Sequence, residues 1–174
     1  MDNRYEINLK DVIEYKKIVF FRFDDKIYLE NTVLSREGIF VDFNLNGRAS
    51  PAGSDAFVEI ELSGVVSGTC SICACDARMG INARSEIVAS KNSEKYNSED
   101  SLLIKGTEVN IYQLVVETIL LFLPITLTCS PNCRGLCPGC GVNLNVETCR
   151  CEKDSGENGF NLIARKFQFK NGGD

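Results

Sequence analysis

The sequence predicts an α+β fold: a mostly antiparallel, curved sheet with one main helix, about residues 110–123, followed by a cysteine-rich C-terminal tail. Three observations lead to this class. Short apolar runs, several alternating with polar residues, dominate the first half of the chain and are typical of strands. One later segment repeats apolar residues at helical spacing, and six of the nine cysteines follow it. We expect an α+β domain over residues 1–128 and a tail over 129–174 packed on it.

The first strands are expected to form a hairpin. Apolar residues at 18–23 and 26–29 flank Asp24-Asp25, which suits a turn between two strands. Residues 39–43 alternate apolar and polar side chains, as a half-buried strand does. Gly, Pro and Ser then gather in 47–54, which predicts a loop.

The next strand pair is expected to enclose a turn that carries cysteines. Residues 57–62 alternate cleanly, and the strand pattern continues towards Cys70. Residues 79–88 have the pattern of a return strand, so Cys70 to Asp76 should lie at the turn between the two strands. The polar stretch 91–101 has no apolar periodicity and predicts an exposed loop or linker.

The main helix is predicted by a buried face at helical spacing. Asn110 suits the N-cap, and Pro124 suits a stop just after Leu123. Glu117 lies amid apolar residues, either at the solvent edge of the helix or paired with a buried partner such as an arginine. The residues that share the apolar face are Ile111, Leu114, Val115, Thr118, Ile119 and Phe122.

The composition excludes several kinds of function. The chain has 174 residues, and none of them is histidine or tryptophan. A Ser-His-Asp triad, a histidine general base and a Cys/His zinc finger therefore cannot be built within it. The net charge is −5, so bulk charge does not attract nucleic acid or an anionic membrane. Metal ligands, if present, must be thiolates, carboxylates or backbone oxygens.

The charge is unevenly distributed along the chain. The acidic excess lies before residue 129, and the tail is nearly neutral with local basic residues. Such residues are most often simply solvated. If RNA or a protein partner is bound, we expect the contact in the tail, at Arg134, Arg150, Arg165 and Lys166.

The cysteines indicate a reducing compartment. The first residues lack the basic and then apolar pattern of a signal peptide, and polar residues interrupt the apolar stretch 109–127 before it could span a bilayer. A cytoplasmic location is therefore expected, with no membrane contact. Clustered cysteines in the cytoplasm more often bind metal or act in redox chemistry than form structural disulfides.

The spacing within the tail predicts a zinc site. Cys137 and Cys140 are separated by Pro138-Gly139, which favours the tight turn that brings two thiolates to one ion. Cys149 and Cys151 lie two apart, so on an extended segment both sulfurs face the same ion and complete a Cys₄ site. Unrelated thiols, a redox-active cluster and an iron–sulfur site are the alternatives.

A second zinc site is a weaker prediction. Cys70 and Cys73 form another CxxC pair, and Cys129 and Cys133 remain after the first site is assigned. Together these four cysteines would join the sheet to the tail. A single site that draws ligands from Cys129 or Cys133 is the competing interpretation. Cys75 is left as a bystander.

These motifs resemble those of a known family. Residues 111–124 read IYQLVVETILLFLP, residues 133–145 read CRGLCPGCGVNLN, and Cys149-Arg150-Cys151 follows. This pattern is similar to the YceD family, known as large ribosomal RNA subunit accumulation proteins. An upstream CxxC turn, here Cys70 and Cys73, is also a family feature. Ile72 departs from the arginine that is common in the family turn.

The resemblance implies a role in the synthesis, processing or stability of large-subunit (23S) ribosomal RNA. The direct partner would be ribosomal RNA or a ribosome-assembly protein, and no small-molecule substrate is expected. A closed Cys₄ site leaves no open coordination position, which favours a non-enzymatic binding module. The alternative is a zinc-dependent thiol redox switch or a chaperone-like protein. An enzyme with Cys75 as nucleophile is disfavoured, because no histidine can activate the thiol.

Overall fold

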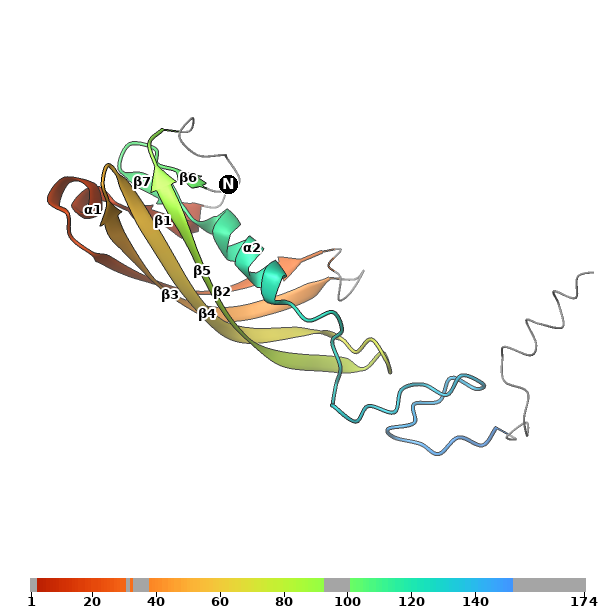
Figure 1. The fold of residues 1–174 in the computed structure, drawn as a ribbon. Helices are drawn as coiled ribbons and strands as arrows, with labels where there is room; N and C mark the ends of the chain where they lie inside the picture. Colours follow the sequence, from red (N-terminus) through yellow and green to blue (C-terminus); the bar gives the residue numbers. More distant parts are fainter. Residues whose placement is uncertain (1–2, 31, 33–37, 93–100, 152–174) are drawn as a thin grey trace, which may run out of the picture. The chain divides into compact units, whose positions relative to one another are not determined.

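The computed structural model describes residues 3–30, 32, 38–92 and 101–151 (Figure 1). The chain divides into two compact units, Met1–Cys133 and Arg134–Asp174, and the second is described as far as Cys151. The first unit contains the helices and strands. The described part of the second, residues 134–151, consists of turns, loops and an isolated bridge between Leu136 and Asn143.

The first unit is built on a five-stranded sheet of order β2-β3-β4-β5-β6. Its four long strands pair antiparallel, and the short β6 pairs parallel to the end of β5. A second, two-stranded sheet pairs β1 with β7. The strand bounds are Glu6–Asn8 (β1), Val19–Leu29 (β2), Ile39–Ala52 (β3), Asp55–Thr69 (β4), Asp76–Ser90 (β5), Ser101–Leu103 (β6) and Glu108–Asn110 (β7). The predicted α+β class with a mostly antiparallel sheet is confirmed.

Alternation of apolar and polar residues decides which face of the long strands is buried. In β3 the buried residues Ile39, Val41, Phe43 and Leu45 alternate with exposed ones. These side chains and the buried residues of the helix α2 form one hydrophobic core. The opposite face of the same strands carries the exposed side chains.

Two predictions about turns are wrong. No hairpin forms at Asp24-Asp25, because β2 runs straight through both residues. The Asp25 carboxylate accepts a 2.6 Å hydrogen bond from the Tyr5 hydroxyl and pairs with Arg4, so the strand can continue through this aspartate. The loop predicted at 47–54 is strand as far as Ala52. The missing side chain of Gly47 leaves room for the Phe21 ring rather than making a turn.

The helix α2, Tyr112–Phe122, confirms the main predicted helix. The Asn110 side chain accepts a 2.9 Å hydrogen bond from the Tyr112 backbone N–H, although the residue at the N-cap is Ile111. Glu117 lies at the solvent edge and accepts a hydrogen bond from Gln113. The predicted apolar face of α2 is buried except for Phe122, which is half-exposed at the end of the last turn.

Five short elements were not predicted: η1 (Asn3–Tyr5), α1 (Lys10–Tyr15), the paired strands β1 and β7, and β6. The predicted return strand and the turn at Cys70 to Asp76 are confirmed. Most of the predicted loop 91–101 lies outside the described residues. Within the described part of the chain, no helix has the length and apolar character needed to cross a bilayer.

Candidate metal centres

The turn between β4 and β5 forms the first half of a cysteine cluster. The Cys70 backbone N–H donates a 2.7 Å hydrogen bond to the Cys75 carbonyl, and the Ala74 N–H donates one of 3.0 Å back to Cys70. Ala74 adopts a left-handed conformation, with φ of 57°, to close this turn. The turn places the Cys70 and Cys73 sulfurs on the same side.

The segment after α2 supplies the second half. The Leu127 carbonyl accepts a 2.8 Å hydrogen bond from the Ser71 N–H, which fixes the segment to the turn. Cys129 follows two residues later, and a 3.2 Å hydrogen bond from the Cys133 N–H to the Ser130 carbonyl turns the chain back. The Sγ–Sγ distances are 3.5 Å between Cys73 and Cys129 and 3.9 Å between Cys70 and Cys133.

We call these four residues, Cys70, Cys73, Cys129 and Cys133, the Cys70 cluster; their sulfurs all lie within 4.8 Å of one another. Cys70 and Cys73 are only 2% and 3% exposed. Burial opposes ionisation of Cys70, yet the backbone N–H groups of Ile72 and Cys73 lower the pKa of its thiol to about 6. The Cys75 N–H favours the Cys73 thiolate, but burial and the neighbouring thiols raise the pKa of Cys73.

The second unit contains another cluster, Cys137, Cys140, Cys149 and Cys151, which we call the Cys137 cluster; these sulfurs also lie within 4.8 Å of one another. Cys149 Sγ lies 3.2 Å from the Cys137 sulfur and 3.7 Å from the Cys140 sulfur. A Cβ at Gly139 would stand 3.0 Å from Cys151 Sγ, so glycine allows this close approach.

Backbone hydrogen bonds shape the turn of the Cys137 cluster. The Gly141 N–H donates to the Cys137 carbonyl at 2.8 Å, with Gly141 at φ of 74°. The pKa of Cys137 is lowered to about 6, most by a hydrogen bond from the backbone N–H of Cys140 and next by one from the Cys149 thiol. Hydrogen bonds with the Cys140 and Cys149 thiols raise the pKa of Cys151 to about 12. Each cluster therefore has one thiolate favoured by the N–H groups of its turn.

Two asparagines close the loop between the CxxC and CxC pairs. The Asn145 side-chain oxygen accepts a 2.7 Å hydrogen bond from the Arg134 N–H, and Asn143 accepts one of 2.9 Å from the Asn145 N–H. A further hydrogen bond of 2.9 Å joins the Leu144 N–H to the Gly135 carbonyl. Short polar side chains can hold such a loop by bonding to nearby backbone groups.

Each cluster can hold one metal ion by its donor set. Four cysteine sulfurs converge in each, which is the donor set of metals that favour sulfur, and the N–H groups of the turns would complement the negative charge of metal-bound thiolates. The two groups have the same members as the two sets proposed from spacing. Cys75 belongs to neither group; it is exposed, and its thiol donates to the Cys73 carbonyl at 3.7 Å.

The basic residues singled out in the tail are placed only in part. Arg134 and Arg150 are exposed in the second unit. Arg165 and Lys166 lie outside the described residues. The sequence analysis did not predict that Leu127 attaches the segment after α2 to the turn between β4 and β5. The alternation of apolar and polar residues that leads into Cys129 could have indicated that Leu127 is buried.

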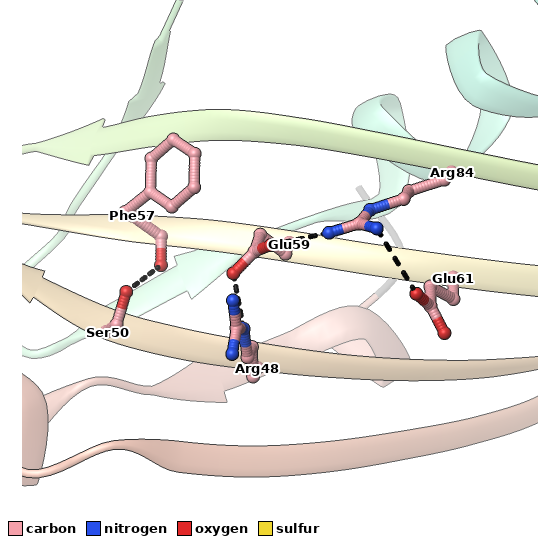
Figure 2. A network of polar contacts seen from close by, with 6 residues as sticks. All are labelled: Arg48, Ser50, Phe57, Glu59, Glu61 and Arg84. Atoms are coloured by element: carbon pink, nitrogen blue, oxygen red, sulfur yellow. Dashed lines mark hydrogen bonds and ion pairs between the residues drawn. The ribbon is translucent and has the colours of Figure 1, made fainter.

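A polar network on the exposed face of the sheet was also missed. Figure 2 shows the Glu59 carboxylate between two arginines: Arg48 donates to Oε2, and Arg84 donates to Oε1 at 3.0 Å. Arg84 also lies 3.8 Å from Glu61. The register places Arg48 opposite Glu59 across β3 and β4, and Glu61 opposite Arg84 across β4 and β5. Finding this network from the sequence would therefore have required the alignment of the strands.

A family model described as "Large ribosomal RNA subunit accumulation protein YceD" matches residues 58–164. The chain belongs to the YceD family. The match covers more than half of the chain and includes all eight cysteines of the two clusters. The resemblance stated from the cysteine motifs is thereby confirmed.

Curated relatives of this YceD-family chain are similar over shorter stretches. It is 34% identical over 68 residues to the chloroplastic YCED homolog 1 of Arabidopsis thaliana, covering 37% of this chain and 21% of the relative. It is 27% identical over 115 residues to an uncharacterized protein of Mycobacterium tuberculosis, covering 64% of this chain and 55% of the relative. The chain thus spans about a fifth to about half of these relatives. No solved structure matches it.

Proposed function

We propose that this YceD-family protein is a non-enzymatic factor in the synthesis, processing or stability of large-subunit ribosomal RNA. The observation that carries the proposal is the family match over residues 58–164, which includes both cysteine clusters. The partner is ribosomal RNA or a ribosome-assembly protein, met in the cytoplasm, with Arg134, Arg150, Arg165 and Lys166 as candidate contacts.

Each cluster binds one zinc ion in this proposal. A tetrahedral ion with Zn–S bonds of about 2.3 Å sets its sulfurs roughly 3.8 Å apart. The Sγ–Sγ distances of 3.5 and 3.9 Å in the Cys70 cluster, and of 3.2, 3.7 and 4.0 Å in the Cys137 cluster, support this fit. Four protein ligands leave no position for substrate, so the metal stabilises structure. The Cys70 cluster joins the domain over residues 1–128 to the tail over 129–174.

The test is depletion of the protein in its own cells, followed by measurement of mature large-subunit against small-subunit ribosomal RNA. We expect the ratio to fall and to recover with a plasmid copy of the wild-type chain. A copy with Cys137 and Cys140 replaced by serine should rescue less well. An unchanged ratio after depletion would contradict the proposal.

A redox switch is the second candidate, favoured by the exposure of Cys140 and Cys151 in the Cys137 cluster. Peroxide would oxidise two thiolates to a disulfide, be reduced to water and release the zinc ion. The expected result is zinc release at low peroxide, reversed by a thiol reductant in the presence of zinc. Zinc that stays bound in oxidised protein would count against this function.

A further inference from the structure

One face of the main sheet exposes three aromatic side chains. Phe20 and Tyr28 of β2 are 75% and 46% exposed, and Phe40 of β3 is 47% exposed. All three occupy positions opposite to those that build the core, where Val41 and Phe43 are buried. Aromatic rings on a sheet face are expensive to leave in water, and they are the usual platform on which proteins stack unpaired bases.

Tyr28 and Phe40 form a fixed pair. They are direct cross-strand partners, and their ring centroids lie 4.8 Å apart with an interplanar angle of 40°. The Tyr28 ring also lies against Gly38, where a Cβ would collide with it, so the glycine leaves room for this ring position. Lys26 places its ammonium 4.9 Å from the Phe40 ring centroid. The pair is thus an ordered apolar surface with a cation beside it.

Two exposed cations, Lys26 and Arg78, lie around this pair, with the exposed Asp42 opposite Lys26 in the strand register as an acidic neighbour. Arg78 is exposed on the same face, in the row that runs from Phe40 through Ser67 of β4 to β5. Among the residues that the structure describes, neither Lys26 nor Arg78 forms an ion pair. At the other end of the same face, by contrast, Arg48 and Arg84 are neutralised by Glu59 and Glu61 (Figure 2).

We propose that Tyr28 and Phe40 form a stacking platform for unpaired bases of RNA, with Lys26 and Arg78 contacting the flanking phosphates. RNA as the occupant rests on the proposed function. Because the whole chain carries a net charge of −5, stacking rather than general attraction must supply the affinity. The affinity should therefore depend weakly on salt, with a log–log slope of about −1.4 for two phosphate contacts.

The absence of tryptophan from the chain gives a direct test. Phe40→Trp introduces a single tryptophan, which can be excited apart from the tyrosines, into the platform, and Phe20→Trp is the matched control on the same face. Phe20 lies eight residues before Tyr28 in β2, roughly 26 Å along the strand. The purified full-length variants are titrated with single-stranded oligouridine, and with the same strand annealed to oligoadenosine.

We expect saturable quenching of the Phe40→Trp emission by the single strand, with little effect on Phe20→Trp and little effect of the duplex. Tyr28→Ala should weaken binding about tenfold, whereas Tyr28→Phe should retain it, which separates stacking from loss of folding. RNA binding without quenching at Phe40→Trp would overturn the platform but leave the proposed function intact. A ribosomal protein that has been treated with nuclease and still changes the emission of Phe40→Trp would also overturn the platform, because it would show that this face binds a protein. An unchanged ribosomal RNA ratio on depletion would reject the proposed function independently of this result.

Discussion

The Ser71 backbone N–H donates a 2.8 Å hydrogen bond to the Leu127 carbonyl, joining the β4–β5 turn to the segment after α2. The Leu127 side chain is fully buried, and its Cδ2 would lie 3.2 Å from a Cβ placed on Gly68. Cys129 follows Leu127 by two residues, so this contact sets where the second half of the Cys70 cluster lies. Packing of one apolar residue is therefore coupled to the geometry of a metal site.

Replacing Leu127 with alanine should destabilise the first unit and weaken its metal site. A buried leucine-to-alanine change costs ~2–5 kcal/mol. Loss of this anchor should also reduce the metal affinity of the Cys70 cluster, because Cys129 is no longer held beside Cys73. Urea unfolding measures the stability, and competition with a chromogenic chelator measures the affinity.

Ile125→Ala is the matched control for Leu127→Ala. Ile125 lies two residues earlier in the same segment and is 87% exposed. We expect the free energy of unfolding of the Ile125→Ala variant to stay within about 0.5 kcal/mol of that of the parent, as for most surface changes. Equal losses in the two variants would show that the segment matters as a whole and that the buried contact does not.

Metal content should separate the two clusters. Elemental analysis of the purified protein is expected to find two zinc ions, falling by one in Cys70→Ser and by one in Cys149→Ser. Cys75→Ser should keep both, because Cys75 lies outside both groups of sulfurs. One zinc in the parent, unaffected by Cys70→Ser, would contradict the two-site arrangement.

Zinc release should occur in two phases because the clusters differ in burial. The Cys70 cluster has two buried ligands and one exposed ligand, Cys129, whereas the Cys137 cluster has one buried ligand, Cys137, and two exposed ones, so a chelator should reach the Cys137 cluster more readily. Absorbance of a zinc-sensitive chelator after mixing would follow both phases. Cys149→Ser should lack the fast phase and Cys70→Ser the slow one. A single phase in the parent would show that burial does not control release.

The sequence predicted the elements whose pattern is local. The helix, the return strand and the turn at Cys70 follow from residue spacing within about 15 residues. The predictions from the sequence were wrong where contacts with residues distant in the chain decide whether a segment is strand or turn. Asp25 remains in a strand because Tyr5 donates to it, and Gly47 accommodates a ring from β2. Neither partner is adjacent in the sequence, so turn preferences alone gave the wrong result.

In the candidate sites, too, the features set by local spacing could be predicted and those set by distant residues could not. The CxxC and CxC spacing identifies each half of the Cys137 cluster, because the backbone turn between the ligands is short. The pairing of Cys70 and Cys73 with Cys129 and Cys133 rests on the contact between Ser71 and Leu127. The aromatic pair of Tyr28 and Phe40 depends on strand register, which alternation alone does not supply.

The pH dependence of stability should report the Glu59 network. Hydrogen bonding by Arg48, opposed by burial and aided by Arg84, lowers the pKa of Glu59 from its ordinary value of 4.5. The charged form is therefore favoured in the folded protein. Its contribution is present above about pH 4.5 and is lost as the pH falls through the lower folded pKa. Glu59→Gln should lower Tm at neutral pH, by an amount that shrinks on acidification.

The control for this prediction is Glu61→Gln. Its carboxylate is largely exposed and lies 3.8 Å from Arg84, so the pair contributes little to stability. Thermal unfolding followed by circular dichroism between about pH 7 and about pH 3 measures all three proteins. The Tm difference between the parent and Glu59→Gln should converge towards zero at the acid end, while that for Glu61→Gln stays small throughout. A difference for Glu59→Gln that is constant with pH would mean that packing of the side chain, and not its charge between two arginines, stabilises the sheet.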